Sequence, residues 1–99
     1  MKPSVGRIVH YKLSASDAEA TNRRRVPGAG HADPWPAGAQ AHVGNSVGAG
    51  NIVPLLITTV WTPTTVNGQA FLDGNDSLWV TSAVEGDQDG QWSWPARVE

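Results

Sequence analysis

The hydrophobic pattern is clearest in the C-terminal half of the chain, where short apolar runs alternate with turn-forming residues. Ile52–Trp61 is apolar at both alternate sets of positions, and Ser77–Glu85 alternates apolar with polar residues. Both patterns are typical of β-strands. Together with Val66–Leu72 and a final extended segment at Trp92–Trp94, they predict a meander of short antiparallel strands.

Two local features refine this meander. Asp73-Gly74-Asn75-Asp76 is a strong hairpin-turn sequence, because glycine and asparagine tolerate positive φ, and its two aspartates are interpreted as turn residues. Pro54 cannot donate a hydrogen bond to a neighbouring strand, so the strand around it is expected to begin there, at an edge or a bulge.

The N-terminal segment Val5–Leu13 is also predicted to be a strand, because it is rich in β-branched and aromatic residues. The odd-numbered residues would lie on one face, and Ile8, His10 and Lys12 on the other. Since Ile8 and Val9 are both apolar, the pattern leaves open which face meets the core. A two-sided environment or an interface would resolve this.

A helix is predicted at residues 16–25. Ser16 and Glu19 have the spacing of a capping box, and Asp17 places negative charge in the first turn. Arg23–Arg25 complement the helix dipole at the other end, and Pro27 stops the helix. Alanines are its only hydrophobic residues, so it is expected to lie shallowly on the sheet or to project from it.

Residues 26–51 are predicted to form a long loop rich in glycine, alanine and proline. Trp35, between two prolines, is interpreted as an anchor on the sheet or on a neighbouring subunit. Gly44, Gly48 and Gly50 surround Asn45-Ser46, and backbone N–H groups in such a segment can hold a phosphate. An ordinary turn before the next strand is the simpler interpretation.

These elements predict one mainly β domain over residues 1–99, with a strand at 5–13, a helix at 16–25, a loop at 26–51 and a β-meander at 52–99. The expected fold is a small SH3-like or OB-like antiparallel barrel with one short peripheral α-helix and a long Gly/Pro-rich loop. A core of this size is modest, so we expect a homo-oligomer that shares apolar surface.

The composition of the chain limits the kinds of ligand and partner that it can bind. The chain has no cysteine, which excludes disulfides and thiolate metal sites. Its net charge of -2 argues against bulk nucleic acid and anionic membranes as partners. The longest apolar run is far too short to span a bilayer, and no signal peptide is visible.

Residue types that commonly carry catalysis form no familiar pattern. His31, Asp33 and His42 would be the candidate metal ligands, but their spacing matches no established site. No nucleophile elbow accompanies the serines. We therefore expect no enzymatic activity, no metal and no cofactor.

Binding is better supported, because tryptophan and arginine are dense in this small chain. Each Trp is also a candidate core residue, and the arginines are also compatible with a solvated helix end. Stacking of a base on an aromatic ring contributes about 1–3 kcal/mol, and guanidinium groups bind phosphate through charge-assisted hydrogen bonds. Trp92 and Trp94 lie two positions apart beside Pro95, a spacing that can create an open stacking platform. The candidate ligand-binding residues are Arg23, Arg24, Arg25, His42, Asn45, Phe71, Asn75, Trp79, Trp92 and Trp94.

Four motifs carry a resemblance to a known family: GRIVHY at 6–11, NRRR at 22–25, FLDGN at 71–75 and WSWP at 92–95. With these motifs the chain resembles a family of small uncharacterised proteins encoded by tailed bacteriophages and prophages. The resemblance implies an accessory protein that acts in the cytoplasm of an infected bacterium. Phage proteins of this size are often antagonists of host defence, some of which bind nucleotide signals without cleaving them, and a minority are virion components.

The resulting hypothesis is a non-enzymatic, oligomeric phage protein that binds and sequesters a small nucleotide-like signal of host defence. The site would lie between the Trp-rich strands, the arginine cluster and the Gly-rich loop. Two alternatives stay open: a structural protein of the virion for capsid decoration or assembly, and an inhibitor that docks directly on a host protein.

Overall fold

The computed structural model describes residues 1–25 and 42–96, which form five β-strands and one α-helix. The predicted anchor Trp35 and the candidate metal ligands His31 and Asp33 lie outside the described residues. The elements are β1 (Ile8–Lys12), α1 (Ala15–Arg24), β2 (Ile52–Val60), β3 (Thr65–Phe71), β4 (Ser77–Val84) and β5 (Trp92–Ser93).

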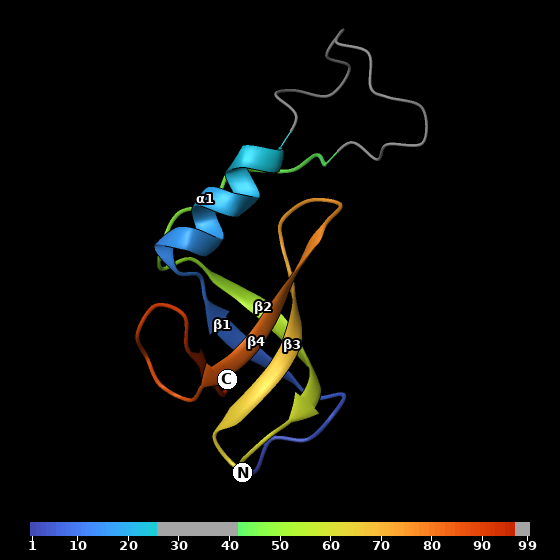
Figure 1. Cartoon of the computed structure of the whole chain (residues 1–99), viewed down its shortest axis with the longest axis vertical. Helices are drawn as coiled ribbons and strands as arrows, with labels where there is room; N and C mark the ends of the chain where they lie inside the picture. Colours follow the sequence, from blue (N-terminus) through green and yellow to red (C-terminus); the bar gives the residue numbers. More distant parts are fainter. Residues whose placement is uncertain (26–41, 97–99) are drawn as a thin grey trace, which may run out of the picture.

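The strands form one antiparallel sheet in the order β4-β3-β2-β1-β5, which curls into a half-barrel (Figure 1). Glu85, directly after β4, makes an isolated bridge to Trp92 of β5, so the two outer strands meet at one end. The prediction of a small, mainly β, antiparallel fold with one short helix is confirmed.

The inner face of the curled sheet holds the hydrophobic core. Val9, Tyr11 and Leu13 are buried and Ile8 is exposed, which decides the face of β1 that the sequence left open. Tyr11 lies opposite Val53 of β2 and opposite Trp92 of β5. The other buried core residues are Val53, Leu55, Ile57, Val66, Ala70, Leu72, Val80, Ala83 and Trp92.

Helix α1 begins one residue earlier than predicted and has a different cap. Ser14 is the N-cap: its Oγ accepts the N–H of Asp17 at 3.1 Å, and Asp17 Oδ2 accepts the N–H of Ser14 at 3.0 Å. The predicted capping box of Ser16 and Glu19 is therefore wrong. Asp17 supplies the side chain that reaches back to the cap, the role predicted for Glu19. Only Ala18 and Thr21 of the helix are buried, in agreement with shallow packing.

Asp17 also joins the helix to the sheet. Its Oδ2 accepts a hydrogen bond of 2.5 Å from the Tyr11 hydroxyl. Burial, this hydrogen bond and the charge of Asp17 all raise the pKa of Tyr11 above its ordinary value. Folding therefore favours the neutral, protonated form of the Tyr11 phenol.

Pro54 does not mark the start of β2, contrary to the sequence-based expectation. The strand begins at Ile52, and Pro54 pairs with His10 of β1. Pairing of β2 with β3 begins only at Leu55, so the missing N–H of Pro54 falls outside that ladder.

A bulge interrupts the edge strand β4. The β3–β4 register shifts between Val66 and Gly68, and Ser82 has a positive φ of 53°. Asn67 Oδ1 accepts the N–H of Ser82 at 2.7 Å and the indole N–H of Trp61 at 3.0 Å. Bulges of this kind make an edge strand a poor template for pairing with another chain.

The part of the chain that the structure describes contains no helix with the length and apolar character needed to cross a membrane.

Candidate functional site

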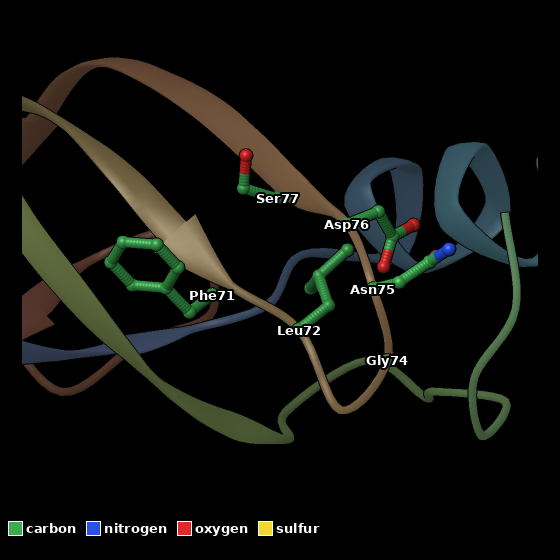
Figure 2. A pocket seen from close by; sticks show the side chains of 6 residues that line it. All are labelled: Phe71, Leu72, Gly74, Asn75, Asp76 and Ser77. Carbon is green, nitrogen blue, oxygen red and sulfur yellow. The ribbon is translucent and has the colours of Figure 1, made fainter. Parts of the chain in front are cut away.

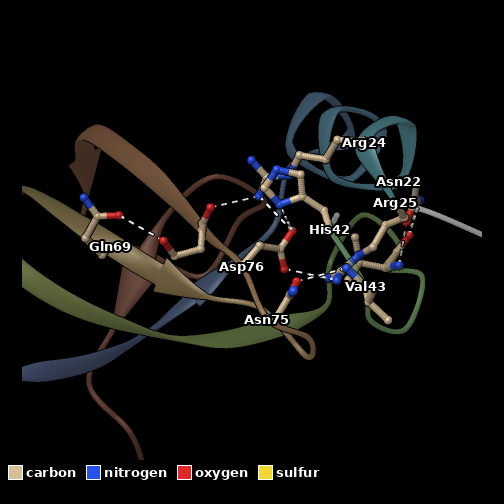
Figure 3. Close-up of polar contacts among 10 residues, drawn as sticks. Asn22, Arg24, Arg25, His42, Val43, Gln69, Asn75 and Asp76 are labelled. Carbon is tan, nitrogen blue, oxygen red and sulfur yellow. Dashed lines mark hydrogen bonds and ion pairs between the residues drawn. The ribbon is translucent and has the colours of Figure 1, made fainter. Parts of the chain in front are cut away.

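Two of the sequence motifs, NRRR and FLDGN, meet at one end of the sheet (Figure 3). We use the name helix–hairpin junction for the three segments that come together there: residues 22–25 at the end of α1, residues 42–47, and residues 72–77 between β3 and β4. Arg25 makes an isolated bridge to His42, and Gly44 makes one to Gly74. The segment 42–47 is thus held against both the helix and the hairpin.

Asparagine side chains fix the segment 42–47 on its two sides. Asn22 Nδ2 donates to the Val47 carbonyl at 2.7 Å, and Asn22 Oδ1 accepts the Val47 N–H at 2.9 Å. On the hairpin side, Asn75 Oδ1 accepts the Val43 N–H at 2.9 Å, and the Asn75 N–H donates to the Val43 carbonyl at 2.9 Å. These paired bonds explain why both motifs contain asparagine.

In the Gly-rich segment 44–50, backbone N–H groups donate hydrogen bonds to acceptors within the protein. The N–H of Asn45 donates to the Asp73 carbonyl at 2.9 Å, and that of Gly48 donates to Asn51 Oδ1 at 2.8 Å. The N–H of Gly50 donates to the Leu13 carbonyl at 2.7 Å. This arrangement favours ordinary turns over a backbone cradle for phosphate.

Glycine is needed at two points where backbones pass closely. A Cβ on Gly74 would lie 2.5 Å from the Val43 carbonyl oxygen and 2.1 Å from Arg25 Nη1. A Cβ on Gly44 would lie 2.5 Å from the Asp73 carbonyl oxygen and 2.0 Å from the same guanidinium nitrogen. The Arg25 guanidinium therefore rests directly on both glycines, and any larger residue would displace it.

A buried carboxylate, Asp76, lies at the centre of the junction, with its side chain 3% exposed. Asp76 Oδ2 is 3.1 Å from Arg24 Nη2, and Oδ1 is 3.1 Å from Arg25 Nη1. His42 Nδ1 lies 3.9 Å from Oδ2, and Arg24 Nη2 also donates to the Ser77 carbonyl at 2.8 Å. Because an unpaired buried carboxylate is costly, these contacts tie the helix to the hairpin.

Within the described residues, Arg24 and Arg25 share one buried carboxylate, that of Asp76. The other carboxylate of the junction, Asp73, is exposed and accepts the Asn45 side-chain amide at 2.7 Å. Within the described residues, the buried Nε of Arg24, all three guanidinium nitrogens of Arg25 and both Asp76 oxygens have no partner with hydrogen-bond geometry. The ion pairs therefore act through charge at 3.1 Å without aligned N–H groups. Buried donors left in this state are unusual in folded proteins and point to a further acceptor.

Two shallow pockets flank Arg24. One, of about 380 Å³, is lined by Ala20, Arg23 and Arg24, which share one face of α1. The other, of about 350 Å³, lies at the hairpin turn. It is lined by Phe71, Leu72, Gly74, Asn75, Asp76 and Ser77 (Figure 2). Both volumes fall near the lower end of the range for ligand sites, about 300–1,000 Å³.

The aromatic motifs lie at the opposite end of β4. Asp76 precedes the first residue of β4, whereas Glu85 after its last residue bridges to Trp92. Trp92 is fully buried, and its indole N–H donates to the Thr64 carbonyl at 3.0 Å. The expectation that Trp92 belongs to an open stacking platform is therefore wrong, because its ring fills the core.

Trp94 completes the packing at this end. Its ring meets that of Trp92 edge to face, with centroids 5.6 Å apart, and the Arg7 guanidinium lies 5.2 Å from the Trp94 centroid. Residues of the GRIVHY and WSWP motifs thus pack against one another.

The structure brings most of the candidate ligand-binding residues to the junction and leaves the tryptophans outside it. The residues at or beside the junction are Arg23, Arg24, Arg25, His42, Asn45, Phe71 and Asn75. Trp79 is exposed on the outer face of the sheet opposite Gln69. The single pocket expected between tryptophans and arginines is not formed by the described residues: Trp92 lies at the other end of β4, and Trp79 lines neither of the two pockets beside Arg24.

Among residues 1–25 and 42–96 no three His, Cys, Asp or Glu side chains are grouped so that they could hold a metal ion. Comparison of the chain with protein-family models, with curated proteins and with solved structures gives no match.

Proposed function

We propose that the protein is a non-enzymatic binding protein that sequesters a small anionic, nucleotide-like ligand at the helix–hairpin junction. The observation that carries this proposal is that two arginines of the junction share one buried carboxylate. An anion held there would neutralise the remaining charge and accept hydrogen bonds from guanidinium donors.

The anionic group would lie in the pocket formed by Ala20, Arg23 and Arg24. The Arg24 side chain is 32% exposed, and Arg23 is open to solvent with only a 3.5 Å surface pair to Glu19. Exposed pairs of that kind contribute little and are easily replaced. Arg25 is buried, so it would act on the anion through its charge and by positioning Asp76 and Arg24.

The planar part of the ligand would lie against Phe71 in the second pocket. Arg24 connects the two pockets, because it lines the first and contacts Asp76 and Ser77 of the second. A ligand with a phosphate at one end and a ring at the other therefore fits across Arg24. The ring would gain about 1–3 kcal/mol from stacking on Phe71.

The residue types at the two pockets support binding without chemistry. Arginine and phenylalanine supply charge and stacking, and the carboxylate of Asp76 is engaged by its cationic partners. The resemblance to phage accessory proteins gives this binding a purpose, namely the removal of a nucleotide signal of host defence from solution.

Calorimetry against inorganic phosphate, ADP-ribose and a panel of cyclic nucleotides tests the proposal. We expect a nucleotide to bind to the wild-type chain, and Arg23→Gln and Arg24→Gln each to weaken it at least about tenfold, as for loss of one charge-assisted contact. Phe71→Ala should weaken the nucleotide and leave phosphate unchanged. Arg7→Gln, which removes an arginine at the other end of β4, is the matched control. Absence of binding to every compound would exclude the proposal.

Mass spectrometry of purified virions separates this function from the virion-assembly alternative, because an assembly protein is present in stoichiometric copies and a ligand-sequestering protein is not.

A further inference from the structure

The outer face of the sheet carries a continuous row of side chains across four strands. In the sheet, Ile8 of β1 lies opposite Leu56 of β2, Leu56 opposite Gln69 of β3, and Gln69 opposite Trp79 of β4. Opposed residues of neighbouring strands point to the same side of the sheet. Their inward neighbours, such as Val9 and Leu55, fill the core.

The same face extends along β2, where alternate residues share a side. Pro54 lies two residues before Leu56 and Ile52 four residues before it, so both are on the same face, and both are exposed. We use the name outer-face patch for Ile8, Ile52, Pro54, Leu56, Gln69 and Trp79. The exposed fractions are 57% for Ile8, 58% for Ile52 and 65% for Trp79.

The apolar area of this patch matches what one partner of a stable interface supplies. Large apolar side chains contribute on the order of 150–250 Å² each when covered, so the exposed parts of the patch total roughly 400–500 Å². A standard interface buries about 800 Å² per partner, of which about 56–65% is apolar. The two figures agree.

The patch carries little charge. The outer positions of β1 also hold His10, opposite Pro54, and Lys12, opposite Ile52 at the margin, whose ammonium donates to the Asp87 carbonyl at 2.7 Å. No Asp or Glu lies in β1, β2, β3 or β4, so a basic partner would find no counter-charge on this face. Two copies of the patch bring mainly uncharged side chains together, which makes it compatible with a second copy of itself.

The shape of the sheet permits this contact. A twisted, curled sheet has the form of part of a hyperboloid, so its outer surface curves outward across the strands and inward along them. Two such saddles fit when the strands of one cross those of the other near a right angle, as in orthogonal sheet packing.

We infer that the outer-face patch is the interface of a twofold homodimer, with a second copy of this chain as its occupant. The inference does not rest on the ligand proposal, because the patch residues do not line either pocket at the helix–hairpin junction, although Phe71 of the hairpin pocket shares the outer face of β3 with Gln69. It also explains why Ile8 is apolar on the outer face of β1.

Sedimentation velocity of the full chain tests the inference. The wild type should sediment as a dimer at protein concentrations of about 50 µM, and Trp79→Ser combined with Ile8→Ser should weaken association at least about 30-fold, as for loss of an interface hot spot. Val43→Ser is the matched control, because Val43 is exposed but lies at the junction. Circular dichroism and thermal melts of each variant establish that the exposed substitutions leave the fold intact.

A second measurement locates the interface without removing apolar side chains. The chain has no cysteine, so Gln69→Cys introduces a unique thiol at the middle of the row, and Glu19→Cys introduces one on α1 as a control. A flexible bis-maleimide should join two copies through residue 69 and not through residue 19. A monomeric wild type, a dimer unaffected by the double substitution, or preferential joining through residue 19 would each overturn the inference. Nucleotide binding measured on the double variant reports on the ligand proposal separately.

Discussion

The tryptophans and the arginines, both candidates for ligand binding, lie at opposite ends of strand β4. The two ends differ in how completely the polar groups of these side chains are paired within the protein. At the aromatic end, Trp92 is buried with its N–H bonded to Thr64, and Trp94 packs between Trp92 and Arg7. At the basic end, two arginines share Asp76, and several of their buried N–H groups have no aligned acceptor in the part of the chain that the structure describes.

This difference indicates which end of β4 can bind a ligand without loss of existing contacts. A ligand at the aromatic end would have to displace core packing, which is costly. At the basic end a ligand could accept hydrogen bonds from guanidinium groups that share one carboxylate. A cluster of tryptophans and a cluster of arginines can thus be equally prominent in a sequence, although one forms part of a well-packed core and the other a polar cluster with unpaired groups.

The largest effect should come from removing the carboxylate at the basic end. Asp76→Asn removes the buried counter-charge that Arg24 and Arg25 share, and breaking a buried ion pair costs about 3–5 kcal/mol. Because Arg24 is partly exposed, we expect a loss near the lower limit, about 3 kcal/mol of unfolding free energy by urea titration. Glu19→Gln, which breaks the exposed pair with Arg23, should change it by less than about 0.5 kcal/mol. Equal effects of the two substitutions would refute the importance of Asp76.

The next effect tests the close backbone approach at the same end. Gly74→Ala places a Cβ against the Val43 carbonyl and the Arg25 guanidinium, and overpacking of this kind costs about 1–3 kcal/mol. Gly48→Ala is the control, because its Cβ would meet nothing within 4 Å. Thermal unfolding should show a clear decrease for the first variant and almost none for the second.

At the aromatic end, the expectation is a pure packing effect. Trp92→Phe removes buried volume and one of the two hydrogen bonds to the Thr64 carbonyl, which keeps the Glu85 N–H at 2.8 Å, so we expect a loss of about 2 kcal/mol and no change in phosphate binding. Trp79→Phe, on the outer face, should leave the stability of the monomer nearly unchanged. A loss of ligand affinity in Trp92→Phe at full folding would show that the aromatic end takes part in binding after all.

The smallest effect concerns Tyr11, whose pKa is raised in the folded chain by burial and by Asp17. The unfolded chain loses the phenol proton near pH 10 and the folded chain keeps it to higher pH, so this contribution to stability is complete below about pH 10 and is lost above it. Tyr11 is the one tyrosine of the chain, so phenolate absorbance follows it directly. Tyr11→Phe should lack this part of the alkaline decrease, and an identical decrease in both proteins would show that the pKa is not raised.

The strands could be predicted from the sequence because the alternation and turn residues act locally. The structure begins or ends β2, β3 and β4 within one residue of the predicted bounds. The helix cap was mispredicted because Ser14, Ser16, Asp17 and Glu19 offer two overlapping boxes, and only the contact with Tyr11 selects Asp17.

The candidate site was harder to predict, since its parts are far apart in the chain. Asp76 looked like a turn residue, and its partners Arg24 and Arg25 precede it by about fifty positions. No periodicity reports such a contact. Trp92 and Trp94 share a spacing that fits an open platform equally well, and only burial of one ring distinguishes the two arrangements.

Binding of an anion by the arginines beside Asp76 can be tested by a phosphate titration of the wild-type protein, followed by NMR of the arginine Nε–H groups. We expect saturable shifts of the Arg23 and Arg24 signals, a smaller shift for Arg25, and none for Arg7. Uniform small shifts of all arginines, or shifts confined to Arg7, would contradict it.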